Sequence, residues 1–278
     1  MPELGPARLP ICPKGVWLGS VAVPAETCSV SVVVPTRNEA ANVGPLAARL
    51  AETLKDVEGG WELLFVDDSD DPTPGAVGSL RRLGLPVELL HRPPGARHGG
   101  LGGAVQEGFA RVRGTVIVVM DADLQHPPEV VPALVAPVLA GEAALVAGSR
   151  YVWAGGDAGL SGPWRHLVSR SCRMLVHLLV PPSRPLQDPL SGLFALQRSL
   201  LDGVALRPEG YKILLEVVVR ARPERVGNVG FDFAPRHAGS SKATVRQGML
   251  FFKHLARLVV AGRRAGPGQP VAQVPLSS

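Results

Sequence analysis

Cysteines, aromatic residues and long apolar runs are all scarce in this chain of 278 residues. The three cysteines form neither a CxxC pair nor a zinc spacing, which argues against a disulfide framework and is typical of a reducing compartment. Phe, Tyr and Trp make up only 5% of the residues, which argues against the stacking surfaces that bind single-stranded nucleic acid. The most apolar stretch, 130–148, is interrupted by Pro132, Pro137 and Glu142, whereas a membrane-spanning helix needs about 20 apolar residues. We therefore expect neither nucleic acid as a partner nor an integral membrane segment.

The net charge of the chain is +5, which favours anionic partners such as nucleotides or lipid phosphates. The N-terminus has no basic segment followed by an apolar core, so the sequence predicts no signal peptide. We expect a cytoplasmic protein whose contact with a membrane is peripheral, at the cytoplasmic face.

Short apolar runs alternate with amphipathic segments through most of the chain. The apolar runs predict buried strands at 30–34, 63–66, 87–90, 116–120 and 145–147. Helical spacing follows several of them, at 39–54, 75–83, 102–112 and 128–139. This alternation predicts an α/β fold with a mostly parallel central sheet flanked by helices.

Composition divides the chain into four parts. A single domain is expected over 29–243, preceded by an irregular, proline-rich arm at 1–28. An amphipathic helix is predicted at 244–262 and a disordered tail at 263–278.

Polar residues follow three of the predicted strands at the point where each strand ends, in segments 35–39, 67–71 and 121–125. Ligands of such sheets bind beyond the carboxyl ends of the strands. We therefore expect the three segments to converge. Carboxylates brought so close repel one another, so a cation or a hydrogen-bonding sugar and base should lie among them.

The sharpest of these signals is the spacing of Asp121, Asp123 and Gln125. Alternate residues leaving a strand point to the same side, so these three side chains are expected to face one point. Oxygen ligands without His or Cys suit Mg²⁺ or Mn²⁺, which also bind substrate phosphates. A competing interpretation is that Asp123 only caps the start of the next helix.

Two further segments favour phosphate binding. Glycines at 99, 100, 102 and 103 open a predicted helix, where backbone amides can meet a phosphate, although a flexible connector explains them equally well. The segment 236–242 is rich in Gly and Ser and has cations at both ends, so it can close over phosphates.

Together these segments resemble the family 2 glycosyltransferases of GT-A fold, and most closely the polyprenol (dolichol) phosphate mannose synthases. The resemblance runs from about residue 29 to 242. It rests on the order of eight pieces: VVVPTRNE at 32–39, VDD at 66–68, GLG at 100–102, MDADLQHPP at 120–128, GSR at 148–150, DPLSGL at 188–193, GYKILLE at 210–216 and the segment 236–242.

The resemblance implies a role for each matching residue. The residues implied to hold the nucleoside are Pro35, Arg37, Glu39, Val66 and Asp68. Those implied to line the metal and diphosphate site are Asp121, Ala122, Asp123 and Gln125. Those implied to surround the donor and acceptor phosphates are Arg150, Lys212, Arg236 and Lys242, with Arg165 and Ser169 placing the lipid phosphate.

The implied reaction is displacement at the anomeric carbon of a nucleotide sugar, with inversion. A sugar hydroxyl as acceptor would require a general base, whereas a phosphate monoester is already mostly ionised at neutral pH. We therefore expect Arg150 and Arg165 to position a polyprenyl or dolichyl phosphate without an essential base. Asp188 is the rival candidate for a base, and also for a residue that binds a sugar hydroxyl or caps a turn.

Several alternatives stay open from the sequence. The donor is expected to be GDP-mannose, with UDP-glucose as the alternative, and a GT-A transferase of soluble glycans is the nearest rival. A receiver-like binding module would explain Asp67 and Asp68 but not the rest of the chain. Apolar helical segments at 167–180 and 249–260 predict either packing on the sheet or contact with an anionic bilayer, alone or with a separate membrane partner.

Overall fold

The computed structural model describes residues 28–151, 163–235, 237–238, 245–264 and 272–273. The strands are β1 Val30–Thr36, β2 Trp61–Asp67, β3 Val87–His91, β4 Val116–Val119, β5 Leu145–Ser149, β6 Phe194–Gln197, β7 Arg225–Gly230 and β8 Ala272–Gln273. The helices are α1 Ala40–Thr53, α2 Thr73–Arg82, α3 Gly100–Phe109, α4 Val131–Leu139, α5 Pro163–Leu179, α6 Ile213–Ala221 and α7 Val245–Arg264.

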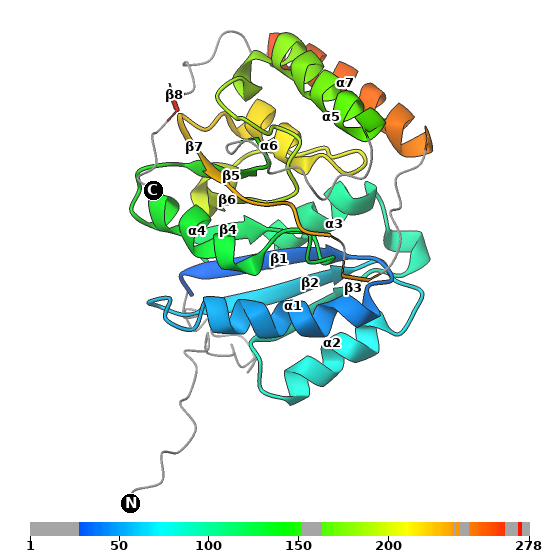
Figure 1. Cartoon of the computed structure of the whole chain (residues 1–278), viewed down its shortest axis with the longest axis vertical. Coiled ribbons are helices and arrows are strands. Elements are labelled where there is room, and N and C mark those ends of the chain that lie inside the picture. The colour runs from blue at the N-terminus through cyan, green and yellow to red at the C-terminus, as the bar shows by residue number, and fades with distance from the viewer. Residues whose placement is uncertain (1–27, 152–162, 236, 239–244, 265–271, 274–278) are drawn as a thin grey trace, which may run out of the picture.

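These strands form one sheet in the order β3-β2-β1-β4-β6-β5-β7-β8 (Figure 1). Strand β6 runs antiparallel to β4 and β5, and the other neighbouring strands are parallel. Strand β1 lies between β2 and β4, with Thr36 opposite Asp67 and Val33 opposite Val119. The expected mostly parallel sheet flanked by helices is confirmed, and the carboxyl ends of three neighbouring strands share one edge.

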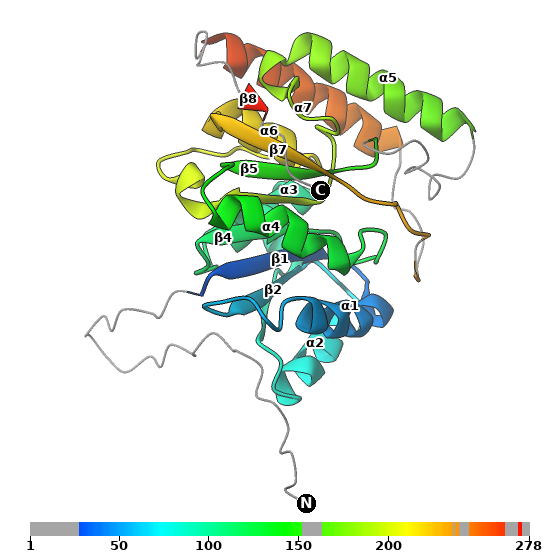
Figure 2. The ribbon, with the colours of Figure 1, turned by 60° about the vertical axis from the view of Figure 1, so that its left-hand side comes forward.

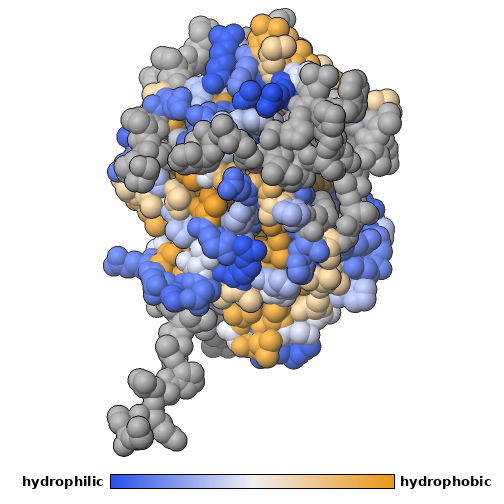
Figure 3. All heavy atoms as spheres, in the orientation of Figure 1, coloured by the Kyte–Doolittle hydropathy of each residue, from blue (hydrophilic) through white to orange (hydrophobic). Residues whose placement is uncertain are grey.

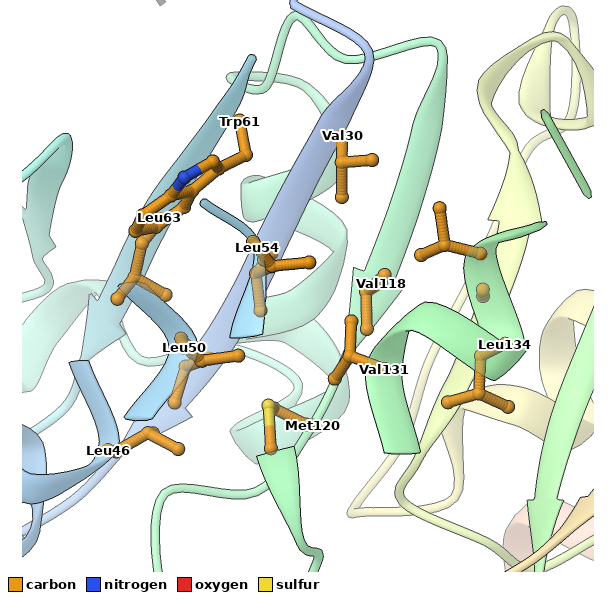
Figure 4. Packing of buried hydrophobic residues seen from close by; sticks show 14 of the residues in the cluster. Val30, Leu46, Leu50, Leu54, Trp61, Leu63, Val118, Met120, Val131 and Leu134 are labelled. Atoms are coloured by element: carbon orange, nitrogen blue, oxygen red, sulfur yellow. The ribbon is translucent and has the colours of Figure 1, made fainter. Parts of the chain in front are cut away.

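Helices cover both faces of the sheet because consecutive side chains of a strand point to opposite faces. Val32 belongs to a buried cluster with residues of α1, α2 and α4, whereas Val33 belongs to a cluster with α3 and α6. Figure 4 shows the first cluster, in which Leu50 of α1 lies close to Leu63 of β2. Trp61 is fully buried there. Burial of one such side chain stabilises the fold by about 1.5–3 kcal/mol.

Helices α5 and α7 lie side by side in a further layer outside α6 (Figures 1 and 2). The three helices share a small apolar cluster that includes Val176 of α5, Val219 of α6 and Leu255 of α7. No helix in the described part of the chain is long and apolar enough to span a bilayer.

The structure differs from the sequence-based expectations mainly in the second half of the chain. Strands β6 and β7 and helix α6 were not among the predicted elements. Both strands are short, β7 has no continuous apolar run, and the apolar residues of α6 follow one another without a clear period. The tail predicted as disordered is ordered in part, since α7 continues through Arg264 and Ala272–Gln273 pairs with β7. The arm predicted at 1–28 lies outside the described residues except for the buried Cys28.

Candidate active site

The three polar segments at the strand ends converge as predicted, and further hydrogen bonds join them to the chain that follows β7. The backbone N–H groups of Ala234 and His237 donate to the carbonyls of Gln125 and Asp123, at 3.0 and 3.2 Å. The side chain of Asn42 in α1 donates to the carbonyl of Ala238 at 3.3 Å. The start of the segment predicted to close over phosphates is therefore held against the segment 121–125.

A turn, not strand alternation, presents the acidic residues after β4. The strand ends at Val119, and Leu124 adopts a left-handed backbone conformation with φ of 61°. The N–H of Gln125 donates to Oδ1 of the buried Asp123 at 3.1 Å across this turn. The expectation that these side chains alternate along an extended strand is therefore wrong. Asp123 also does not cap the next helix, because the cap residue of the turn at Pro128–Val130 is Pro127.

The residues of this turn fit a divalent cation in their donor chemistry. Gln125 donates its side-chain N–H to the carbonyl of Ala234 at 3.2 Å, which leaves the amide oxygen as its possible ligand. Gly192 gives Asp121 room: a Cβ atom at this position would lie 2.6 Å from Asp121 Oδ2. Among the described residues no three His, Cys, Asp or Glu side chains gather as a metal site. A cation here would thus complete its coordination with substrate phosphate oxygens and water.

The carboxylates that follow β2 are neutralised by cations of the chain itself. Arg92, 1% exposed, forms two hydrogen bonds with Asp68, from Nε to Oδ1 at 2.7 Å and from Nη2 to Oδ2 at 2.6 Å. Arg92 also donates to Glu107 of α3 and to the carbonyls of His98 and Gly100. A buried pair of this geometry fixes the Asp68 carboxylate in one orientation. The cation expected among the acidic segments is therefore, on this side, an arginine.

Neighbouring groups extend this ion-pair network. Asp67 is fully buried and accepts hydrogen bonds from Thr36 and Ser69, and its Oδ2 lies 2.8 Å from Nδ1 of His91. Arg97 makes two hydrogen bonds to Asp70, which hold the pKa of that carboxyl below its ordinary value. The segment after β2 is thus rigidly held in the position where a ligand would bind.

The remaining residues implied to hold the nucleoside lie on the same edge. Pro35 and Val66 are buried neighbours in β1 and β2, paired in register. Arg37 is exposed just after β1, and Glu39 accepts a hydrogen bond from Asn42 at 2.6 Å. Together with Asp68, the five residues surround the ends of two adjacent strands.

A second cluster lies where β5 ends. Arg150 donates from Nε to Oδ2 of the buried Asp188 at 2.7 Å, and Asp188 Oδ1 has no hydrogen-bond partner. Lys212 donates to the carbonyl of Leu190 at 2.5 Å. Burial and the nearby Arg150 lower the pKa of Lys212 to about 8, so the side chain is still mostly charged at neutral pH. Two cations and one carboxylate therefore share a partly dehydrated space.

Tyr151 connects this cluster to α5. Its ring lies 5.5 Å from the Arg150 guanidinium carbon and 4.2 Å from that of Arg173. Its hydroxyl is 2.7 Å from the Ser169 hydroxyl. Ser169 is thus near Arg150 through one intervening side chain, as its implied role with the acceptor requires. The side chain of Arg165, and the whole of Arg236 and Lys242, lie outside the described residues.

His126 lies between the two clusters. Its ring contacts Phe231 and Phe233 edge-on, at centroid distances of 5.3 and 5.7 Å. Burial lowers its pKa to about 4, so the ring is neutral at neutral pH. Nδ1 is 3.7 Å from Asp121 Oδ2 and has no hydrogen-bond partner.

The glycines at 99–103 pack against another part of the chain. The N–H of Gly102 donates to the carbonyl of Gly210 at 2.7 Å, so this amide is not available to a phosphate. A Cβ atom on Gly102 would lie 2.8 Å from the side chain of Pro208. The absence of a side chain at Gly102 therefore allows α3 to approach the segment before α6. Gly102 acts neither in a phosphate-binding loop nor as a flexible connector.

Sequence reasoning did not assign roles to Arg92, Tyr151, His126 or Gly192. Arg92 comes two residues after the predicted strand at 87–90, so its place at a further strand end was a usable signal. The burial of His126 and the closeness of Gly192 to Asp121 depend on contacts between distant segments, which local patterns do not encode.

Comparison with known proteins is consistent with this geometry. A model described as glycosyl transferase family 2 matches residues 31–202. A dolichol-phosphate mannosyltransferase from Pyrococcus furiosus is 36% identical over 230 residues, which are 83% of this chain and 63% of that protein. A dolichol-phosphate mannosyltransferase from Saccharomyces cerevisiae is 35% identical over 243 residues, which are 83% of this chain and 86% of that protein. The chain thus spans less than two thirds of the first relative but most of the second.

A solved structure shows the same fold at lower identity. Glucosyl-3-phosphoglycerate synthase from Mycobacterium tuberculosis, in complex with Mn²⁺ and UDP-glucose, superposes with a TM-score of 0.58 and 23% identity over 85% of this chain and 79% of that one. The family model covers more than half of the chain, and the yeast relative is matched over most of its length. The chain therefore belongs to glycosyl transferase family 2 and is a glycosyltransferase of GT-A fold.

Proposed function

We propose that this glycosyltransferase moves mannose from GDP-mannose onto the phosphate of a polyprenyl or dolichyl lipid, with inversion at the anomeric carbon. The observation that carries the proposal is the pair of partly buried cations, Arg150 and Lys212, beside the acidic turn at 121–125. A phosphate acceptor needs such cations, because its own charge opposes approach to the donor diphosphate. The dolichol-phosphate mannosyltransferases among its relatives support this choice of acceptor and sugar.

In the proposed reaction an oxygen of the acceptor phosphate forms a bond to the anomeric carbon. The bond from that carbon to the donor diphosphate breaks, and its electron pair leaves with GDP. Arg150 and Lys212 are proposed to hold the acceptor phosphate. No proton has to be removed, since the phosphate monoester is mostly a dianion above its second pKa near 6.

Asp121, Asp123 and Gln125 are the residues that would hold a divalent cation, Mg²⁺ or Mn²⁺. When bound, such a cation neutralises charge on the leaving diphosphate. The Mn²⁺ in the structure of the mycobacterial synthase supports the use of a divalent cation. Arg37, Glu39 and Asp68, with Pro35 and Val66, are proposed to hold the nucleoside, and Asp68 is oriented for this by Arg92.

Asp188 is proposed to bind a sugar hydroxyl. One of its oxygens accepts from Arg150, and the other is buried without a hydrogen-bond partner. A buried acceptor left unpaired costs about 1–3 kcal/mol, so a donating hydroxyl group at this point is favoured.

The function is tested by a donor screen with lipid extraction. Radiolabelled GDP-mannose and UDP-glucose are each offered with a short polyprenyl phosphate and either Mg²⁺ or Mn²⁺. We expect label from GDP-mannose in the organic phase, only with the cation and the lipid phosphate present. If only UDP-glucose transferred label to the lipid, the proposed donor would be wrong. If label appeared only on soluble glycan acceptors, the proposed lipid acceptor would be wrong.

The layer formed by α5 and α7 is proposed to rest on an anionic membrane. Each helix buries one face and exposes apolar residues on another: Met174 and Leu178 on α5, and Met249, Phe252 and Val260 on α7. Figure 3 shows hydrophobic surface next to strongly hydrophilic surface at this end of the molecule. Packing accounts for the buried faces, and contact with a bilayer is proposed for the exposed apolar faces. The basic side chains of Arg170, Lys253 and Arg257 are exposed nearby, and the cytoplasmic leaflet attracts such residues.

Removing this apolar surface is expected to release the protein from vesicles. In a variant with Met174→Ser, Met249→Ser and Phe252→Ser, flotation with phosphatidylglycerol vesicles should fall at least about tenfold, because each apolar side chain contributes on the order of 1 kcal/mol when buried. The matched control is Leu83→Ser, since Leu83 is 79% exposed just after α2, at the opposite end of the sheet. Equal flotation of the triple variant and the control would remove the membrane proposal.

A further inference from the structure

The imidazole of His126 presents an unused hydrogen-bonding atom to the acidic turn. The side chain is 4% exposed, and the buried Nδ1 has no hydrogen-bond partner. Most buried polar atoms in proteins are hydrogen-bonded, so an unpartnered Nδ1 beside the acidic turn requires an explanation. The nearby carboxylate oxygen is Asp121 Oδ2, at 3.7 Å, slightly beyond hydrogen-bond distance.

The surroundings of the ring fix its position. The two phenyl rings of Phe231 and Phe233 hold it edge-on from the segment after β7. Gly192 lies where the ring and the carboxylate come together, because a Cβ atom there would be 2.6 Å from Asp121 Oδ2 and 3.2 Å from His126 Cε1. The contacts with the two phenyl rings therefore fix the ring beside the Asp121 carboxylate.

We propose that His126 is a positioning residue that donates from Nδ1–H to Asp121 Oδ2 when a divalent cation binds, and so fixes the other carboxylate oxygen on the cation. The inference rests on the proposed function, which assigns the cation to this turn. Because a carboxylate only accepts hydrogen bonds, Nδ1 carries the hydrogen in this pair. Such outer partners orient a ligating group, and their loss weakens metal binding by about 10–100-fold.

The main competing explanation is that His126 only fills space between the two phenylalanines. Substitution can separate the two roles. Phe at this position keeps an aromatic ring against Phe231 and Phe233 but has no donor. Asn has a smaller side chain, yet its amide nitrogen stands where Nδ1 stands.

The test is the affinity of the purified full chain for Mn²⁺ in the presence of GDP, measured from the electron paramagnetic resonance signal of free Mn²⁺. His126→Phe is expected to weaken binding about 10–100-fold, and His126→Asn to stay within about fivefold of the unchanged protein. Gly192→Ala is a second way to disturb the pair, because the added methyl group forces the Asp121 carboxylate to move. This variant should also weaken Mn²⁺ binding. Thermal unfolding and circular dichroism of each variant confirm that it is folded.

Each outcome decides between the proposals. Equal Mn²⁺ affinity of folded His126→Phe and the unchanged protein overturns this inference but leaves the metal site. Equal weakening by Phe and Asn assigns His126 a packing role and likewise overturns it. If the unchanged protein takes up no Mn²⁺ with GDP present, the metal site itself fails. If His126→Phe does not fold, the other two variants still test the inference. It requires that Gly192→Ala weakens Mn²⁺ binding and that His126→Asn retains it.

Discussion

Replacement of Asp123 by alanine is expected to lower the rate of sugar transfer by about a thousandfold while the protein stays folded. The cation that this carboxylate would hold neutralises the leaving diphosphate, and loss of about 4 kcal/mol of that stabilisation corresponds to about three orders of magnitude in rate. The substitution also removes the hydrogen bond that the N–H of Gln125 donates to Asp123 within the turn. Initial rates with labelled GDP-mannose and polyprenyl phosphate, together with Tm, measure both effects.

Glu129→Ala is the matched control for this prediction. Glu129 lies six positions after Asp123, and its carboxylate forms an exposed ion pair with Arg49. Exposed pairs contribute about 0–1 kcal/mol, so the control should transfer sugar at nearly the unchanged rate. Full activity of Asp123→Ala would remove the acidic turn from the mechanism, and equal losses in both variants would indicate a folding defect of this segment.

The first half of the fold and the acidic site could be predicted from the sequence because their signals are local. Continuous apolar runs mark the buried parallel strands, and the order of strand and helix determines which ends are neighbours. The segments 35–39, 67–71 and 121–125 therefore came together as expected. Their detailed geometry was less predictable: β4 ends at Val119, and Asp123 lies in a turn with a left-handed Leu124 and not on an extended strand.

The second half depends on contacts that no local pattern contains. Strand β6 lies between β4 and β5 and runs antiparallel to both. A purely parallel sheet would pair β4 with β5, but β6, which comes later in the chain, separates them. This insertion carries the segment 188–193 to the turn at 121–125, where Gly192 has no side chain and so leaves space for the Asp121 carboxylate. The burial of Arg92 and His126 follows from the same tertiary packing. Charge and spacing alone did not predict the roles of these two side chains, because burial determines the protonation state and the partners of a charged or polar group.

Replacement of Arg150 by methionine is expected to reduce both stability and transfer. The buried Asp188 would lose its ion-pair partner, which costs about 3–5 kcal/mol of unfolding free energy. The acceptor phosphate would lose a cation that acts in partly dehydrated surroundings, and transfer should fall about 10²–10³-fold. Denaturant unfolding and initial rates at saturating GDP-mannose measure the two effects separately.

The double variant Arg150→Met with Asp188→Asn separates the two losses. Without the buried carboxylate most of the stability should return, whereas transfer should remain as low as in Arg150→Met, because the phosphate still lacks its cation. Asp188→Asn alone should retain transfer within about tenfold, since its amide still accepts from Arg150 Nε and no base is required. Recovery of transfer in the double variant would show that Arg150 acts only through Asp188. Complete loss in Asp188→Asn with GDP-mannose binding intact would instead make Asp188 the base and exclude the direct attack of an ionised phosphate.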